Sequence, residues 1–549
     1  MTRLLECVPN FSEGRDPRVI QQITDRIAAV EGVRLLNVDP GKATNRTVVT
    51  FVGEPDAVAE AAFQAIKIAG ELIDMRQHHG EHPRMGATDV CPLVPISGIT
   101  MAEAAEYARK LGERVGRELN LPVYLYEAAQ PNPERKNLAV IRAGEYEGMA
   151  RKILQPEWKP DFGPAAFDAQ RGATVIGARD FLVAYNVNLN TTSTRRAYAV
   201  AFDVREAGRT VKQPDGSELQ QPGTLKAVKA IGWYIAEYGV AQVSMNLTDI
   251  AVTPVHVAFD EVCRAAAERG VRVTGSELVG LVPLQCLLDA GRHFLAKQQR
   301  SVGVSEAELV KIAVRSLGLD ELTPFHPEER VIEYLLRDPS ATRLVAMTVA
   351  QFASETAAES AAPGGGSVSA AVGAFGAALG TMVANLSSHK RGWDHRWQEF
   401  SDHAEQGQRA VQELLFLVDE DTRAFDRVMA GFGMPRGTDE EKAARRLAID
   451  TATLEATRIP FRVMETVLGV MPLIKLMAEQ GQPSSVSDAG VGALCARAAV
   501  MGAYLNVQIN AASLKGNAEA AELVAKGAGM AQRAQQLEDE TLAVVRGKM

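Results

Sequence analysis

The pattern of the chain changes near residue 335, and this change limits the folds open to it. Before that point, short runs rich in β-branched residues alternate with amphipathic segments. Strands are expected over residues 33–39, 47–52 and 123–126, and a helix over 55–75. After residue 342, alanine, leucine, glutamate and arginine dominate at helical spacing. Long helices are expected there over residues 368–387, 397–416, 440–456 and 490–508.

Two interruptions divide the chain further. The segment PEWKPDFGP at residues 156–164 breaks the first region, and new β-rich runs follow at 173–176, 181–190 and 197–204. This predicts an α/β or α+β region of two sheet-containing subdomains, followed by an all-α domain. The segment RTVKQPDGSELQQP at residues 209–222 reads as an exposed insertion. We expect subdomains over 1–178 and 179–326, a proline-edged linker over 327–341 and a helical domain over 342–549.

Composition limits the classes of protein to which the chain can belong. With 549 residues, of which 46% are hydrophobic, the chain can fill several cores. A formal net charge of -9 argues against nucleic acid as a partner, because phosphate binding needs a basic face. Five scattered cysteines without a C-x-x-C pair favour a reducing compartment. With no run of about 18 apolar residues free of charges or turn formers, we expect a soluble cytoplasmic protein with no membrane partner.

The most polar segment is HHGEHPRMGATDVCP at residues 78–92, which holds three of the nine histidines. Within it, His78, Glu81 and His82 have the H-x-x-E-H spacing of a zinc site. That spacing brings both histidines to one metal only on a continuous helix. A glycine lies between the two histidines and a proline follows the second, so helix is disfavoured. A zinc hydrolase therefore remains only an alternative.

Several segments resemble the glutamate formimidoyltransferases. They are ECVPNFSEG at 6–14, TNRT at 44–47, residues 80–92, DFGP at 161–164, GATVIGAR at 172–179 and VGLVP at 279–283. The second half, which opens with SAAPGGGSV at 360–368, is similar to formimidoyltetrahydrofolate cyclodeaminase. The order and the fusion resemble those of the bifunctional formimidoyltransferase-cyclodeaminase family over essentially the whole chain.

This resemblance implies two consecutive reactions in histidine degradation. The first moves the formimidoyl group of N-formimidoyl-L-glutamate to N5 of tetrahydrofolate, and the second closes 5-formimidoyltetrahydrofolate to 5,10-methenyltetrahydrofolate with release of ammonia. Tetrahydrofolate, with or without a polyglutamate tail, would be the co-substrate, and no metal or prosthetic group is expected. The family also implies a homo-oligomer built through both the helical domain and the transferase domain.

The transfer needs one group that both accepts and donates a proton near neutral pH, and histidine suits this task. The resemblance marks His82 as that group. Glu81, Arg84 and Asp89 are close enough in sequence to orient it or to hold a carboxylate.

Both substrates carry carboxylates, so positive side chains are needed to offset their desolvation. Arg46 and Arg84 are the candidates, and Asp39 at a strand end is a candidate for the amino group or amidinium of the donor. The family's folate-binding stretch falls on ten residues, where the glycines allow close backbone approach and the aromatic ring can stack. They are Gly163, Pro164, Ala165, Ala166, Phe167, Asp168, Ala169, Gln170, Arg171 and Gly172.

In the helical half, ring closure needs a carboxylate that moves a proton and stabilises the methenyl cation. The resemblance places it at Asp419 or Asp421, which lie two apart and so point to different faces of a helix, and only one should face the pocket. Which one it is stays open here. Gly364, Gly365 and Gly366 precede a long helix and can offer backbone N–H groups to a polar ring, although close helix packing would explain them equally. The folate tail is predicted to meet Lys390.

Two further alternatives remain beside the zinc hydrolase. The helical half could be a methenyltetrahydrofolate cyclohydrolase, which would release no ammonia. The chain could also be a folate-binding scaffold without catalysis, which would bind tightly and turn nothing over.

Overall fold

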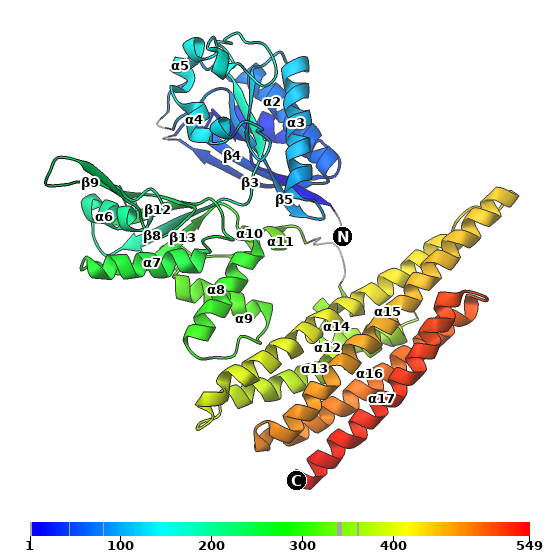
Figure 1. Cartoon of the computed structure of the whole chain (residues 1–549). Coiled ribbons are helices and arrows are strands. Elements are labelled where there is room, and N and C mark those ends of the chain that lie inside the picture. Colours follow the sequence, from blue (N-terminus) through cyan, green and yellow to red (C-terminus); the bar gives the residue numbers. More distant parts are fainter. Residues whose placement is uncertain (1–2, 43, 81, 338–342, 360–361) are drawn as a thin grey trace. The chain divides into compact units, whose positions relative to one another are not determined.

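The computed structural model describes residues 3–42, 44–80, 82–337, 343–359 and 362–549 (Figure 1). It divides into two compact units: Met1–Cys286 with Leu317–Leu336, and Leu287–Ser316 with Arg337–Met549. Sheets and helices alternate in the first unit, and the second is helical. The predicted fold class is thereby confirmed.

The first unit begins with a seven-stranded sheet, in the order β1-β4-β2-β5-β7-β6 with β3 paired to β4. Its strands are β1 (Leu4–Cys7), β2 (Asn10–Phe11), β3 (Val33–Gly41), β4 (Arg46–Gly53), β5 (Thr88–Ser97), β6 (Val123–Glu127) and β7 (Thr174–Ala178). Only the pairs β5–β7 and β6–β7 are parallel. The predicted strands in this region are confirmed, and the helix predicted over 55–75 is α2 (Pro55–Leu72).

Helices α1 (Pro17–Ala28), α2 and α3 (Met101–Glu118) share one core with this sheet, into which β4 sends Val49 and Phe51. Since side chains alternate along a strand, Arg46 and Val48 point to the opposite face. Asp39 pairs with Val48, so it lies on that same face. The sheet thus brings two predicted binding residues, Asp39 and Arg46, to one surface.

Beyond Glu127 the chain builds a cover for part of that opposite face. Short helices η1 (Pro133–Arg135), α4 (Leu138–Arg142), α5 (Glu145–Lys152) and η2 (Pro156–Trp158) follow β6 in order. Ile141 of α4 and Met149 of α5 are buried in a cluster with Tyr124 and Tyr126 of β6. These helices therefore cover β6 and β7 on this face, close to the end of the loop that leads into β5.

The second sheet has the order β11-β12-β8-β13, with all pairs antiparallel. Its elements are β8 (Val183–Leu189), β11 (Val228–Ile235), β12 (Val240–Leu247) and β13 (Val273–Val279), with helices α6 (Thr194–Val204) and α7 (Val255–Glu268) packed against it. Residues 197–204, predicted among the β-rich runs, lie in α6, so this prediction is wrong. Ser193 caps the helix, and Ala197, Val200 and Val204 recur at helical spacing on its buried side.

Two segments between these elements were predicted as loop or linker. Residues 209–222 form an exposed hairpin of β9 (Arg209–Lys212) and β10 (Glu218–Gln221). The first part of the predicted linker contains α10 (Pro327–Arg330) and α11 (Ile332–Leu335). The Ile332 N–H donates to the Val282 carbonyl oxygen at 3.1 Å, which ties this part to the first unit. Residues 338–341 of the predicted linker lie outside the described part of the chain.

The second unit is dominated by five long helices. It comprises most of α8 (Leu284–Lys297) and α9 (Glu306–Leu317), then η3 (Leu344–Ala346), α12 (Val349–Thr356), α13 (Gly365–Ser388), η4 (Asp394–Arg396), α14 (Trp397–Phe432), α15 (Asp439–Gln480), η5 (Pro483–Ser485), α16 (Val486–Ser513) and α17 (Ala518–Lys548). The four helices predicted from spacing are confirmed and are longer than predicted. Helix α13 packs against α14, α15 and α16, and its alanines line the shared core.

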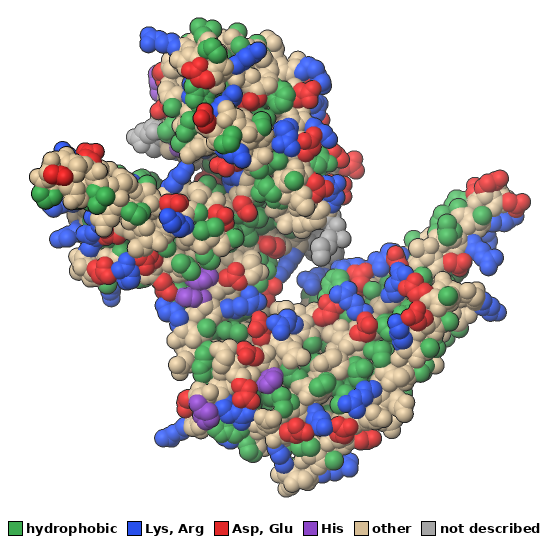
Figure 2. Space-filling model, in the orientation of Figure 1, with side chains coloured by type: hydrophobic (Ala, Val, Ile, Leu, Met, Phe, Trp, Pro, Cys, Tyr) green, Lys and Arg blue, Asp and Glu red, His purple; other side chains and the backbone are tan. Residues whose placement is uncertain are grey.

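Two segments of this bundle, α13 and Pro483–Ser513, are long and apolar enough to cross a membrane by length and composition alone. Within the bundle, 61% of the apolar window of α13 is buried, but only 44% of that of the second segment. Figure 2 shows hydrophobic side chains between charged ones on the face of this unit that is in view. Part of the apolar surface of α16 is therefore left without a partner inside the described chain.

Candidate active sites

The loop between α2 and β5 carries His82. Its described residues form turns and bends and contain no helix, so His78 and His82 do not share a helical face. Glu81 lies outside the described residues. Among the residues that the structure does describe, no group of three or more metal-binding side chains occurs. The zinc interpretation lacks the helix that it requires and is not favoured.

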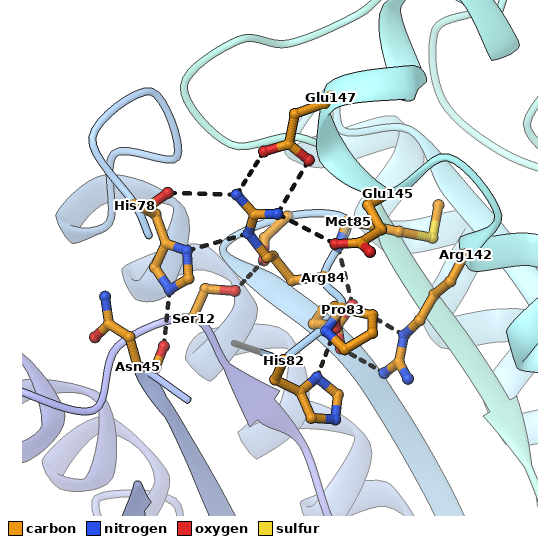
Figure 3. Close-up of polar contacts among 12 residues, drawn as sticks. Ser12, Asn45, His78, His82, Pro83, Arg84, Met85, Arg142, Glu145 and Glu147 are labelled. Atoms are coloured by element: carbon orange, nitrogen blue, oxygen red, sulfur yellow. Dashed lines mark hydrogen bonds and ion pairs between the residues drawn. The ribbon is translucent and has the colours of Figure 1, made fainter. Parts of the chain in front are cut away.

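The half-buried ring of His82 has both nitrogens engaged. Its Nδ1 donates to the Pro83 carbonyl oxygen at 2.6 Å (Figure 3), which leaves Nε2 as an acceptor. The Arg46 guanidinium donates to Nε2, and its other terminal nitrogen donates to Oδ1 of Asn10. Burial, and then the charge of Arg46, lower the pKa of His82 to about 4. The ring is therefore a neutral base held beside a cation.

A buried ion pair lies behind this loop. Asp89 on β5 is fully buried and accepts from the Met85 N–H at 3.0 Å and from Arg142 Nε at 3.3 Å. Arg142 ends α4, so the pair joins the loop to both the sheet and the helix that covers it. Asp89 thus fixes the backbone three residues beyond the ring, and its role in orienting His82 stays a prediction.

Arg84 points away from His82 (Figure 3). It is buried and donates to Glu147 at 2.7 and 3.0 Å, to Glu145 at 3.3 Å and to the ring and carbonyl of His78 at 3.3 and 3.4 Å. His78 in turn meets the Asn45 carbonyl oxygen at 2.7 Å through Nε2. All five N–H groups of Arg84 are thus used inside the chain, and none is free for the substrate carboxylate that the sequence suggested. Arg84 instead ties the loop to α5.

The structure brings the predicted folate-binding stretch alongside this loop. Gly172 forms an antiparallel bridge with Gly86, and the Ala87 N–H donates to the Arg171 carbonyl oxygen at 2.8 Å. The ring of Phe167 lies 5.4 Å from that of Tyr146, whose N–H donates to the Arg84 carbonyl oxygen at 2.8 Å. The stretch and the loop therefore lie side by side, and their bridge stands four residues beyond His82.

Inside the stretch, two predicted residues bind each other. Asp168 accepts from the backbone N–H groups of Gln170 and Arg171 at 3.0 and 2.9 Å, and its side chain pairs with that of Arg171 at 2.7 Å. Pro164 and Ala165 follow Gly163, which has a φ of +79°. The stretch is thus a self-supported turn rather than a loose loop.

A second site lies at the start of α13. Ser367 Oγ is 3.1 Å from Asp421 Oδ2 and 3.2 Å from the Thr422 hydroxyl. A Cβ on Gly366 would stand only 2.2 Å from Asp421 Oδ1, so the carboxyl group occupies the space beside the glycines. Burial raises the pKa of Asp421. On the other side of the glycines, Asn506 of α16 is 3.2 Å from where a Cβ on Gly365 would lie.

Asp419 faces a different part of the chain. Its Oδ1 accepts from the Leu344 N–H at 2.8 Å, and its Oδ2 lies 3.3 Å from Arg343 Nε. Asp419 therefore anchors the segment that enters the bundle, while Asp421 faces the glycines at the start of α13. The contacts separate the two aspartates that sequence reasoning left equivalent.

Lys390 is not part of the second site. It follows the carboxyl end of α13, whose 24 residues at about 1.5 Å each put it roughly 36 Å from the glycines. Its Nζ stands 3.9 Å from the centre of the Trp393 ring. Its predicted contact with the folate tail is therefore not supported beside Gly364, Gly365 and Gly366.

Sequence reasoning did not assign roles to several residues of these sites. Asn10, Asn45 and Ser367 lie inside the segments that carry the resemblance, which was a signal for them. Arg142, Glu145, Glu147 and Asn506 carried no spacing signal, because they meet the sites only through the fold, whereas Thr422 directly follows Asp421 in sequence.

Three family models match the chain. The N-terminal subdomain of the formiminotransferase domain matches residues 4–179, the formiminotransferase domain matches 184–337, and formiminotransferase-cyclodeaminase matches 348–528. A formimidoyltransferase-cyclodeaminase of Rattus norvegicus is 45% identical over 511 residues, 93% of each chain. A glutamate formimidoyltransferase of Streptococcus pyogenes is 42% identical over 295 residues, 54% of this chain and 94% of that one. A methenyltetrahydrofolate cyclohydrolase of Methylorubrum extorquens is 35% identical over 169 residues, 31% of this chain and 81% of that one.

Proposed function

The chain belongs to the formimidoyltransferase-cyclodeaminase family, and from this premise we propose that it catalyses both reactions of that name. The first half transfers the formimidoyl group of N-formimidoyl-L-glutamate to N5 of tetrahydrofolate. The second half closes 5-formimidoyltetrahydrofolate to 5,10-methenyltetrahydrofolate and releases ammonia, as a step of histidine degradation. A match to formimidoyltransferase-cyclodeaminases along 93% of their length supports both halves together. The similarity to the cyclohydrolase covers less of the chain and does not favour that alternative.

In the transfer reaction, His82 moves the proton. The N5 amine attacks the amidine carbon, Nε2 accepts the proton that the amine loses, and the same nitrogen returns it to the departing glutamate nitrogen. The observation that carries this proposal is the bond from Nδ1 to the Pro83 carbonyl oxygen, which fixes the tautomer with its lone pair on Nε2. Arg46 and Asp39, on one face of the sheet, bind a carboxylate and the amidinium of the donor.

The folate lies along residues 163–172, with Phe167 against one of its rings. The bridge between Gly86 and Gly172 supports this assignment, because it places the stretch beside the catalytic loop. Tetrahydrofolate, free or with a polyglutamate tail, is the co-substrate, and we propose that neither reaction uses a metal or a prosthetic group.

In ring closure, Asp421 is the acid–base group. N10 attacks the carbon of the protonated formimidoyl group, N5–CH=NH2+, and loses its proton to Asp421, which passes it to the nitrogen that leaves as ammonia. The ionised carboxylate then faces the cationic methenyl bridge. Its position against Gly366 and Ser367 supports this choice, whereas Asp419 is occupied by Leu344 and Arg343. The backbone N–H groups at the start of α13 bind polar atoms of the pterin.

We further propose a cytoplasmic homo-oligomer, joined through both the helical domain and the transferase region, with no nucleic-acid or membrane partner. The support is an apolar surface on α13 and α16, where Phe375, Leu505 and Ile509 are 57%, 64% and 71% exposed. A second copy of the chain would cover it. Sedimentation of the full chain with Leu505→Lys tests this, and an assembly unchanged by the substitution would count against this surface.

The test of the transfer mechanism is His82→Ala in the full chain. Formimidoyl transfer should fall at least about 100-fold, because the proton has no carrier. Ring closure of supplied 5-formimidoyltetrahydrofolate, followed by methenyl absorbance and by ammonia, should be unchanged. His79→Ala is the matched control, since His79 is an exposed neighbour in the same loop. Retained transfer in His82→Ala would refute the mechanism.

A further inference from the structure

The bond between Arg46 and His82 occupies the nitrogen that the transfer reaction needs. Because Nδ1 donates to the Pro83 carbonyl oxygen, Nε2 is the ring position that can accept a proton. Arg46 Nη1 donates to this same nitrogen. In this conformation the base is therefore capped by a cation and cannot take a proton from an attacking amine.

The guanidinium of Arg46 is itself incompletely paired. Its second terminal nitrogen donates to the neutral amide of Asn10, and its Nε is buried without a hydrogen-bond partner among the described residues. Burial lowers the pKa of Arg46 to about 10, so the side chain still carries its charge at neutral pH. A buried cation with an unused N–H is suited to a carboxylate, which can accept two bonds from one edge of the fork.

We propose that Arg46 acts as a switch on His82 and that binding of the substrate moves it. This proposal rests on the proposed transfer reaction. A carboxylate of the formimidoyl donor draws the guanidinium from Nε2 to itself, and the lone pair of Nε2 becomes free for the N5 proton. The donor thus exposes the base that acts on it. Arg46 is then a residue that determines specificity as well as a binding residue.

The charges around the His82 ring favour Arg46, rather than Arg142, as the residue that responds to the substrate. Among the residues that the structure describes, three charged groups act on His82: Arg46 from β4, Arg142 from α4 and Asp89 from β5. Arg142 is already paired with Asp89, so its charge is compensated where it stands. Arg46 has no carboxylate partner among the described residues, so an incoming carboxylate changes the field at the ring through Arg46. Its arrival should raise the pKa of His82 from about 4 towards its ordinary value of 6.5.

The first experiment follows the ring directly. The His82 resonance of the isotopically labelled full chain, assigned by its loss in His82→Gln, is titrated with pH with and without glutamate. Glutamate, the leaving product that retains both donor carboxylates, is used at concentrations that inhibit transfer. In the wild type its addition should raise the pKa of His82 by at least one unit. In Arg46→Gln the pKa should be raised without any ligand and should not respond to glutamate.

The second experiment separates the sources of the carboxylate. Donors that lack either the α- or the γ-carboxylate are compared with N-formimidoylglutamate, and tetrahydropterin is compared with tetrahydrofolate. For the donor lacking the carboxylate that Arg46 binds, kcat in the wild type should fall about 100-fold or more. In Arg46→Gln, removal of the same carboxylate should lower kcat little further. Arg46→Lys, which keeps the charge, should show part of the wild-type response.

The switch is refuted if glutamate leaves the pKa of His82 unchanged in the wild type, or if both proteins lose the same factor when a donor carboxylate is removed. If kcat falls only when the folate tail is removed, the donor is not the substrate that moves Arg46. Binding of tetrahydrofolate shows that Arg46→Gln has folded. If the wild-type chain transfers no formimidoyl group, the proposed function fails. If His82→Ala still transfers, the role proposed for His82 fails, and the switch fails with it. If His82→Ala is inactive while Arg46→Gln responds like the wild type, only the switch fails.

Discussion

Gly86 and Gly172 face each other across an antiparallel bridge, and neither position has room for a methyl group. A Cβ on Gly86 would lie 2.3 Å from the Ala173 carbonyl oxygen, and one on Gly172 would lie 2.2 Å from the Met85 carbonyl oxygen. This bridge is the point where the segment of residues 163–172 meets the loop of His82. The close backbone approach that only glycine permits therefore sets the geometry of the transferase site.

Gly172→Ala should lower formimidoyl transfer and destabilise the first unit, because the Met85 backbone must move. Gly216→Ala is the control: Gly216 also has a positive φ, +83° against +72° for Gly172, but a Cβ there meets nothing within 4 Å. Both variants suffer backbone strain of about 1 kcal/mol, and only Gly172→Ala adds a collision. Transfer kinetics and chemical denaturation measure the difference. Equal losses in the two variants would contradict the steric explanation.

Asp421→Asn and Asp419→Asn should separate catalysis from folding in the helical unit. Asp421→Asn keeps the shape but removes the proton carrier, so ring closure should fall about 100-fold or more with the bundle intact. Asp419→Asn weakens the anchor of Leu344 and Arg343, so it should destabilise the bundle by about 1–2 kcal/mol and keep most of the activity. Ammonia release and helix content against denaturant are the measurements. The reverse pattern would make Asp419 the catalytic group.

Glu6→Gln should stabilise the first unit at alkaline pH and not at acid pH. Burial raises the pKa of Glu6 from 4.5 to about 7 against the attraction of Arg179. A raised folded-state pKa means that stability is full below 4.5 and is lost as the pH rises through about 7. At about 1.4 kcal/mol per pKa unit, the loss is on the order of 3 kcal/mol. Calorimetry of the full chain at pH 5 and pH 8 should show a gain only at pH 8, and a gain at both would point to packing instead.

Arg84→Lys should lower transfer although Arg84 does not face His82. One ammonium cannot replace the paired bonds to Glu147 and the contact with His78, so the loop loosens and His82 is misplaced. Because the glutamates are largely exposed, the stability loss should stay near 1 kcal/mol, while kcat falls about 10-fold. Arg76→Lys is the matched control, since Arg76 pairs with Asp74 at the surface near the same loop. An identical kcat in both variants would remove Arg84 from the positioning of the base.

Periodicity predicted the elements well where it had one interpretation, as in the long helices of the second unit. It failed at residues 197–204, where AYAVAFDV alternates like a strand and also repeats like a helix. The cap from Ser193 and the buried spacing of Ala197, Val200 and Val204 decided in favour of helix. Local pattern cannot decide such a segment, because the choice depends on the sheet against which it packs.

The sites show the same limit. Sequence reasoning gave Arg84 to the substrate because it lies two residues from His82, yet Glu145 and Glu147, about sixty residues away, take up its donors. It left Asp419 and Asp421 equivalent because their roles depend on segments 54 to 75 residues away. Residues close together in sequence indicated which reactions to expect, whereas contacts in the fold determine which side chains are available for them.

Asp421 fills the volume that any side chain at position 366 would need. The two positions are therefore coupled through space. Any larger residue at 366 would have to push the carboxyl group at 421 out of its present place. A change at 366 should thus be felt at the acid on the neighbouring helix before it is felt anywhere else in the bundle.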